Sequence, residues 1–143
     1  MRISTKGRYS LIALLYIALL EEGSFASARE ISDATGISEG YLEQLFILLR
    51  KTGIIQGVRG PQGGYFLERA AKDISAGEVL RAVEGSLSPT ECVSGSACPN
   101  ESRCQSRQTW GDLNEGINEF ADSITLADLV KDYNTHKEPE YSI

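Results

Sequence analysis

The spacing of apolar residues predicts a chain that begins with three short helices. Residues 7–21 are apolar nearly all round, which is typical of a helix buried between others. Residues 28–35 have the pattern of a short amphipathic helix, and Gly36 ends it. Within residues 39–52 the apolar side chains fall at positions i, i+3, i+4 and i+7 and share one helical face, namely Leu42, Leu45, Phe46 and Leu49. Ser38 is the expected N-cap of this third helix.

The second and third predicted helices have the layout of a helix-turn-helix. A helix, a tight turn and another helix place the second helix in the major groove of DNA. The same spacing also suits a helical hairpin inside a larger core. The next segment favours DNA binding, because residues 54–67 contain two short strand patterns around a Gly/Pro turn. A hairpin directly after a helix-turn-helix is a wing.

Arg59 lies near the tip of this predicted wing, beside glycines. Its small neighbours leave the guanidinium room to enter a narrow minor groove, where the negative potential of DNA is enhanced. The alternative is a solvated turn residue. Because the hairpin follows a helix-turn-helix, we expect the groove contact.

A further helix and a loop are predicted after the wing. Ser75 and Glu78 have the spacing of a capping box for a helix that stops at Gly85. Residues 86–104 are rich in Ser, Pro, Thr, Gly and Asn, which is typical of a loop.

From about Gln105 the pattern becomes helical again. Apolar residues recur at alternating steps of three and four, the spacing of a seam between packed helices, at Trp110, Leu113, Ile117, Phe120 and Ile124. Burying this seam against a second copy of the chain would form a dimer. The alternative is that it packs on the first helix of its own chain. A last short helix, with a capping box at its start, is expected to end at Val130 and to be followed by a polar tail.

The charge distribution modifies this picture. The net charge is −6, but residues 1–70 carry eight basic against seven acidic side chains, whereas residues 71–143 carry six against thirteen. Arg2, Lys6 and Arg8 make the amino-terminus basic. A DNA-binding protein needs a basic face rather than a basic total charge, so the acidic balance does not exclude DNA. We find no nucleophile–base pair, phosphate loop or carboxylate pair in a site context, so an enzyme is not expected.

Neither a membrane span nor a secreted protein is expected. The longest apolar run, Leu11–Leu20, has ten residues, too few to cross a bilayer. The amino-terminus lacks the pattern of a signal peptide. The odd cysteine count of three also argues against paired disulfides. We therefore expect a cytoplasmic protein without a membrane partner.

The three cysteines, Cys92, Cys98 and Cys104, are evenly spaced, with five mostly small or turn-forming residues between neighbours. Three interpretations compete: ordinary thiols, a redox switch that uses low-pKa thiolates, and a metal centre. Clustering outside the apolar segments disfavours ordinary thiols. The spacing differs from the close cysteine pairs of structural zinc, whereas thiolates also suit iron–sulfur clusters. The only histidine is His136, so a fourth ligand is not evident.

Several motifs together resemble one family. They are residues 1–9, residues 36–38 with 41–46, residues 58–61 with 63–65, and the evenly spaced cysteine triplet. Over about residues 1–133 the chain resembles the IscR-type iron–sulfur cluster regulators, whose relatives include the nitric-oxide sensor NsrR and the cysteine-metabolism repressor CymR. The resemblance implies a mainly α fold, with a winged helix-turn-helix DNA-binding domain and a C-terminal dimerisation helix. The expected division is a DNA-binding domain at residues 1–72, a cluster-binding loop with dimerisation helices at 73–133, and a flexible tail at 134–143.

The resemblance also implies a function. The chain would be a homodimeric repressor or activator on double-stranded operator DNA, regulating iron–sulfur cluster biogenesis genes. A labile [2Fe-2S] cluster on Cys92, Cys98 and Cys104, donated by the cluster-assembly machinery, would change its operator preference. A [4Fe-4S] cluster, a nitric-oxide or thiol-redox sensing repressor, and a cluster-free regulator of cysteine metabolism are alternatives.

One position departs from the family pattern. IscR-type proteins carry a histidine three residues after the third cysteine, and here that position is Arg107. A guanidinium has no lone pair to donate and is not an iron ligand. The fourth ligand is therefore open between Glu101, Gln105, a residue from elsewhere or from the partner subunit, and solvent.

DNA contacts follow from the resemblance and from the predicted helices. Glu43 resembles the residue that rejects one operator class in the absence of cluster, although a solvated helix charge is the alternative. Gln44 is placed to contact a base edge, and Tyr41 to contact the backbone or a thymine methyl. Residues at the amino-terminus are expected on phosphates, which position the protein without specifying sequence. The complete predicted set is Arg2, Thr5, Lys6, Arg8, Tyr9, Ser38, Tyr41, Glu43, Gln44 and Arg59.

Overall fold

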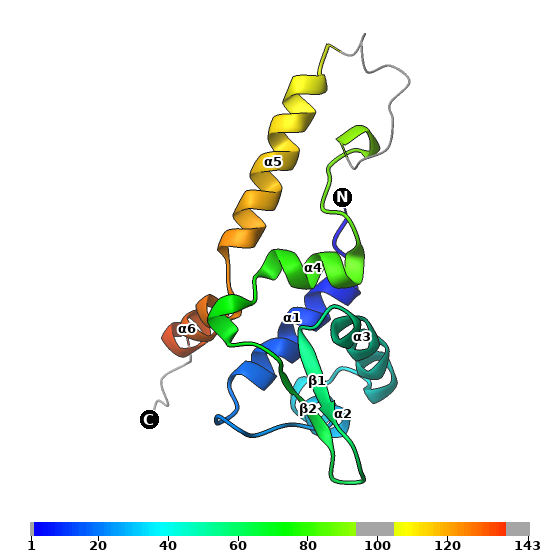
Figure 1. Cartoon of the computed structure of the whole chain (residues 1–143), viewed down its shortest axis with the longest axis vertical. Coiled ribbons are helices and arrows are strands. Elements are labelled where there is room, and N and C mark those ends of the chain that lie inside the picture. Colours follow the sequence, from blue (N-terminus) through cyan, green and yellow to red (C-terminus); the bar gives the residue numbers. More distant parts are fainter. Residues whose placement is uncertain (1, 94–104, 137–143) are drawn as a thin grey trace, which may run out of the picture.

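The structure is a computed structural model that describes residues 2–93 and 105–136 (Figure 1). It confirms the mainly α winged helix-turn-helix fold. The elements in chain order are α1 (Thr5–Ala18), α2 (Ala28–Thr35), α3 (Glu39–Lys51), β1 (Ile55–Val58), β2 (Gly64–Leu67), η1 (Ala71–Asp73), α4 (Ala76–Glu84), η2 (Glu91–Val93), α5 (Arg107–Ser123) and α6 (Leu126–His136).

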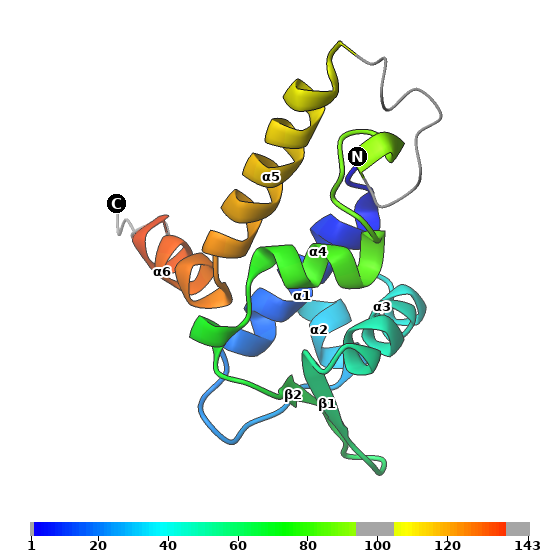
Figure 2. The same cartoon turned by 45° about the horizontal axis from the view of Figure 1, so that its top comes forward.

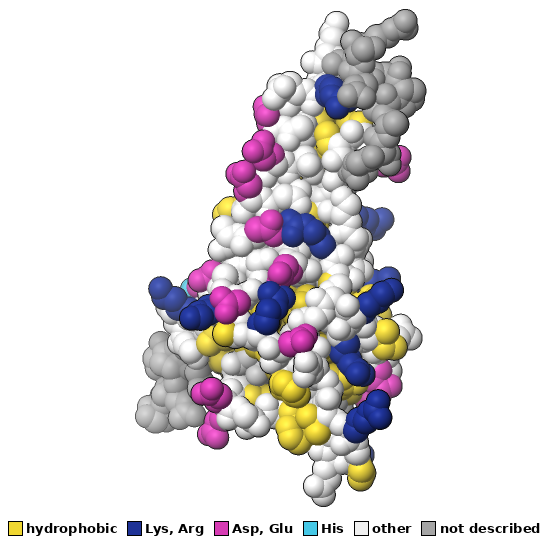
Figure 3. All heavy atoms as spheres, in the orientation of Figure 1, with side chains coloured by type: hydrophobic (Ala, Val, Ile, Leu, Met, Phe, Trp, Pro, Cys, Tyr) yellow, Lys and Arg dark blue, Asp and Glu magenta, His cyan; other side chains and the backbone are white. Residues whose placement is uncertain are grey.

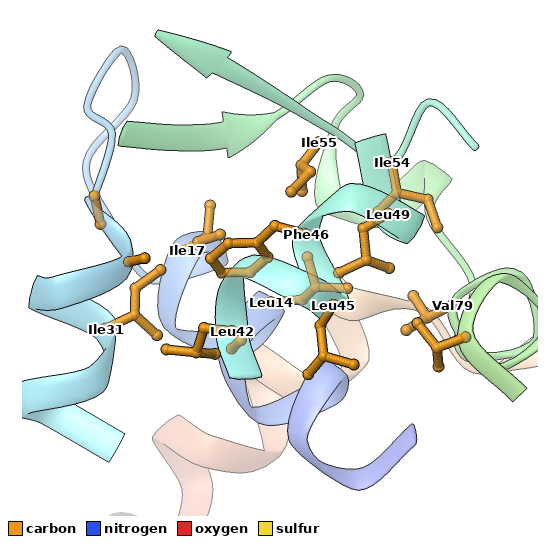
Figure 4. Close-up of a cluster of buried hydrophobic side chains, with 14 of the residues drawn as sticks. Leu14, Ile17, Ile31, Leu42, Leu45, Phe46, Leu49, Ile54, Ile55 and Val79 are labelled. Atoms are coloured by element: carbon orange, nitrogen blue, oxygen red, sulfur yellow. The ribbon is translucent and has the colours of Figure 1, made fainter. Parts of the chain in front are cut away.

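The core lies between α1, α2, α3 and the base of the wing. Leu14 and Ile17 of α1 point toward Leu42 and Phe46 of α3, and all four side chains are buried (Figure 4). Leu42 and Phe46 belong to the apolar stripe whose helical spacing predicted α3. Burying the stripe on α3 leaves its opposite face in solvent, which orients the helix for an external partner.

The wing is an antiparallel pair of strands that is fastened to the core. Ile55 pairs with Leu67, and Val58 with Gly64, in the register of the hairpin. The Tyr65 N–H donates to the Ala26 carbonyl (2.7 Å), which attaches the hairpin to the loop before α2. A side chain at Gly64 would clash with that loop, because its Cβ would lie 2.5 Å from the Ala26 oxygen. The glycine therefore permits the close approach.

Helix α4 connects the winged domain to α5. The Arg81 guanidinium donates to both carboxylate oxygens of Asp122, the shorter contact being 2.7 Å, and to the Asn118 side-chain oxygen. Gly77 lies at the crossing, where a Cβ would meet the Asp122 carboxylate. From this junction α5 extends away from the winged domain in both views (Figures 1 and 2).

Two predicted helices have other boundaries in the structure. The first helix begins at Thr5 and ends at Ala18, rather than covering 7–21, because Ser4 caps its start and the Leu20 N–H donates to the Ile17 carbonyl in a turn (3.1 Å). The last helix does not end at Val130.

Helix α6 instead continues to His136, so the start of the expected tail at 134–143 is helical. The predicted Thr125–Asp128 capping box is present, with both reciprocal hydrogen bonds formed. No glycine or proline interrupts the following turns, and Thr135 donates back to the Lys131 carbonyl (2.9 Å). Within the described ranges no helix is long and apolar enough to span a membrane.

Candidate nucleic-acid interface and cysteine segment

Helix α3 presents a polar face to solvent, as the helix-turn-helix prediction requires. Gly36 adopts φ +79 as the C-cap of α2, and the Ser38 hydroxyl accepts from the Tyr41 N–H (3.2 Å) to start α3. Glu43 and Gln44 are exposed on the face opposite the core. The turn and the cap therefore place the predicted recognition residues on an accessible helix.

A polar groove of about 510 Å³ separates α3 from the wing. Glu39, Glu43 and Arg50 line it from α3, and Arg59 lines it from the wing. Arg59 is exposed and is followed by Gly60 at φ +110, which turns the chain at the hairpin tip. The structure therefore brings Glu43 and Arg59 to opposite walls of one groove.

The start of α1 contacts α3 through a pair of hydroxyl groups and a pair of tyrosine rings. The hydroxyl oxygens of Thr5 and Tyr41 are 2.9 Å apart and share a hydrogen bond. The Tyr9 and Tyr41 rings meet edge to face, with centroids 5.8 Å apart. Both tyrosines and Thr5 are half-buried, so part of their surface is used in fixing α1 to the recognition helix.

The basic residues predicted to contact phosphates remain accessible. Arg2, Lys6 and Arg8 are exposed, and the Arg8 guanidinium lies 5.9 Å from the Tyr9 ring centroid. Figure 3 shows Lys and Arg side chains along the edge formed by the amino-terminus, α3 and the wing, and acidic side chains along α5. In this view α5 is mainly acidic, whereas basic side chains gather along the predicted DNA-binding edge.

Ile47 of α3 was missed by sequence reasoning. It is 65% exposed, although it is a large aliphatic residue in the middle of a helix. It lies one helical turn after Glu43 and Gln44, outside the buried stripe. Ile47 is apolar but lies outside the helical spacing of the buried residues of α3, and this mismatch could have identified it from the sequence.

The cysteine segment is described only at its borders. Cys92 is a half-buried free thiol in η2, with its sulfur 2.9 Å from the Thr90 hydroxyl oxygen. Cys98 and Cys104 lie outside the described residues. Among residues 2–93 and 105–136, no three His, Cys, Asp or Glu side chains gather as a metal site. Helix α5 begins at Arg107 and contacts η2.

The predicted seam on α5 is accessible in the single chain. Trp110, Ile117 and Ile124 are half-buried, whereas Leu113 is 45% and Phe120 is 70% exposed. The main contacts of α5 within the chain are with α4 and η2. The α4 contact uses the polar Asn118 and Asp122, and Leu113 and Phe120 of the seam remain exposed in the single chain.

A family model described as "Iron-dependent Transcriptional regulator" matches residues 3–132. The chain belongs to the Rrf2 family. It is 45% identical over 130 residues to the HTH-type transcriptional regulator IscR of Erwinia tasmaniensis, which covers 91% of this chain and 79% of that protein. The IscR of Serratia proteamaculans is 44% identical with the same coverage.

Solved structures of Rrf2 regulators share the fold. The structure of T. potens IscR has a TM-score of 0.74 and 36% identity, and the match covers 99% of this chain and 94% of that one. CymR, the global cysteine regulator of B. subtilis, has a TM-score of 0.75 and 34% identity, covering 92% and 97%. The chain is therefore a DNA-binding transcriptional regulator and not an enzyme, as predicted.

Proposed function

We propose that this Rrf2 protein is a homodimeric regulator of iron–sulfur cluster biogenesis genes that senses cluster status through its three cysteines. The observation that carries the proposal is the 45% identity to a protein named IscR, together with the C-x₅-C-x₅-C triplet. The cluster-assembly machinery would donate the cluster.

The proposed DNA complex follows from the accessible surfaces. The exposed face of α3 enters the major groove with Glu43 and Gln44, and the wing carries Arg59 to the adjacent minor groove. Arg2, Lys6 and Arg8 contact phosphates. Dimerisation through the α5 seam repeats this surface, which suits a pseudo-palindromic operator.

The donor set agrees in chemistry with an iron–sulfur group. Cys92, Cys98 and Cys104 would supply three soft thiolates, and the Thr90 hydroxyl already lies at hydrogen-bond distance from the Cys92 sulfur. We propose a [2Fe-2S] cluster, with [4Fe-4S] as the alternative. When bound, the cluster supplies a redox-active group that is easily lost. Arg107 stands where the family has a histidine. The three cysteines are therefore the proposed protein ligands, and the fourth ligand is another residue or solvent.

The proposal is tested with chain purified without oxygen. We expect iron and acid-labile sulfide, and visible absorption bands that disappear when the iron is removed. Each form is then used to select duplexes from a random-sequence DNA library. Selection of two different operator classes is expected. Identical selections by both forms would contradict cluster-dependent operator preference but not DNA binding.

A cluster-free regulator is the second candidate. The fold matches CymR as closely as IscR, and Arg107 removes the family histidine. A colourless anaerobic protein without iron or sulfide that still selects one operator would favour this candidate.

Arg59→Ala is expected to weaken operator binding about tenfold, mainly through the sequence that flanks the core site. A guanidinium in a narrow minor groove gains from the enhanced negative potential of A·T-rich DNA, and alanine does not. Affinities are measured on operators with A·T-rich and G·C-rich flanks. An equal loss on both operators would argue for a phosphate contact instead.

Ile47→Ala is expected to remove an apolar contact to a thymine methyl in the major groove. Ile47 is 65% exposed on the recognition helix. A thymine methyl that packs against it removes apolar surface from water, which stabilises the complex. The test replaces thymidine by deoxyuridine at each operator position. One position should weaken binding by the native chain severalfold and leave Ile47→Ala unaffected. Equal losses for both proteins at every position would show that Ile47 reads no methyl group.

A further inference from the structure

A single carboxylate from α4 holds the amino-terminus. Glu84 is the last residue of α4, and its Oε1 accepts three hydrogen bonds. The Ser4 N–H donates at 2.9 Å, the Ser4 hydroxyl at 2.6 Å and the Gly7 N–H at 2.8 Å. This contact joins residues 80 positions apart in the sequence.

The geometry is that of a helix cap supplied by a different helix. The first N–H groups of an α-helix have no partner within the helix, and its positive end attracts a carboxylate. Ser4 caps the Lys6 N–H, and Glu84 takes the Gly7 N–H. Burial raises the pKa of Glu84, but the bonds from Ser4 and Gly7 outweigh it and hold that pKa below its ordinary value. Glu84 is therefore charged at neutral pH.

The backbone of α1 is shaped to admit this carboxylate. A Cβ at Gly7 would lie 3.1 Å from the Glu84 oxygen and 2.9 Å from a Leu80 methyl carbon. A side chain at this position would force the ends of the Leu80 and Glu84 side chains to shift. The contact is thus built into the packing of the two helices.

The residues held by Glu84 are the ones that flank the predicted DNA contacts. Ser4 lies between Arg2 and Lys6, both exposed and basic. The next residue, Thr5, shares a hydrogen bond with the Tyr41 hydroxyl of the recognition helix. An unbroken chain of contacts therefore runs from Glu84 through the first turn of α1 to α3.

We propose that Glu84 is a positioning residue for DNA binding: it orders the amino-terminal turn so that Arg2 and Lys6 face the phosphates and Tyr41 stays in register. The inference rests on the proposed operator complex. The expected change in DNA affinity is opposite to the one that charge alone would cause. Removing a negative charge beside lysine and arginine normally tightens DNA binding. Removing Glu84 will weaken it, because the basic residues lose their fixed position.

Glu84→Ala and Glu84→Gln are compared with Glu22→Ala on the operator selected by the native chain. Glu22 is exposed beyond the other end of α1, so its removal makes the same charge change away from the contact. We expect Glu84→Ala to bind about tenfold more weakly, with the slope of log affinity against log salt reduced by about one for each lost phosphate contact. Glu84→Gln keeps an acceptor oxygen and should lose less. Glu22→Ala should keep the native slope.

Hydrogen exchange of the peptide that covers residues 2–9 provides a readout without DNA. It should quicken in both Glu84 variants and not in Glu22→Ala. Thermal unfolding checks the fold, and Glu84→Gln decides the test if Glu84→Ala is unfolded. Native affinity, slope and exchange in the folded Glu84 variants would overturn the inference. If the native chain selects no duplex, the operator proposal fails, and the exchange result still decides whether Glu84 orders the amino-terminal turn.

Discussion

We expect Phe120→Asp to convert the proposed dimer to a monomer and to reduce operator binding by more than about a hundredfold. Phe120 is 70% exposed in the single chain and is the most exposed large apolar residue of the α5 seam. In a two-fold dimer the same ring is buried twice, and burying one such side chain contributes about 1.5–3 kcal/mol. The variant loses both contributions and must also bury an unpaired carboxylate from each subunit. A monomer then reads one half-site without the gain of a second, linked contact.

Light scattering after size-exclusion chromatography measures the mass, and fluorescence anisotropy measures operator affinity. Phe25→Asp is the matched control, because Phe25 is 40% exposed in the loop before α2 and lies outside α5. It should leave a dimer with native affinity. A folded Phe120→Asp protein that stays dimeric would place the dimer interface elsewhere on the chain.

Local signals explain why the winged domain was predictable from sequence. The boundaries of α2 and α3 depend on Gly36 and Ser38, and these residues act through contacts within a few positions of themselves. The wing depends on a Gly/Pro turn between two apolar stretches. The apolar stripe of α3 then packs on the largely apolar α1, so the position of the recognition face follows.

Contacts between distant elements could not be predicted. The sequence gives no sign that Glu84 caps α1, because the capping pattern is recognised only when the acceptor is local. The same holds for the Arg81–Asp122 pair, which joins α4 to α5. Glu78 illustrates how tertiary structure changes a correct local prediction. Ser75 does accept from the Glu78 N–H, but the Glu78 carboxylate pairs with Arg69 rather than completing the capping box.

We expect Cys92→Ala to remove nearly all the iron and sulfide of the proposed cluster from the anaerobically purified protein. A cluster held by the three cysteines has no family histidine to compensate for the loss of one thiolate, because Arg107 stands at that position. Thr90→Val is the matched control. It removes only the hydroxyl that lies 2.9 Å from the Cys92 sulfur, and such hydrogen bonds change the reduction potential of a cluster rather than its attachment. This variant should keep its iron.

Arg107→His supplies the converse test. It restores an imidazole at the family position, at the start of α5 beside η2. A fourth protein ligand should slow the loss of visible absorbance in air about tenfold, because dissociation would then require an additional bond to break. Faster bleaching in air by Arg107→His would show that the arginine supports the cluster through its charge. Retention of iron by Cys92→Ala would mean that Cys92 is not a ligand. Whatever the result for Arg107→His and Cys92→Ala, the iron-free protein should still bind its operator, because this binding depends on α3 and the wing.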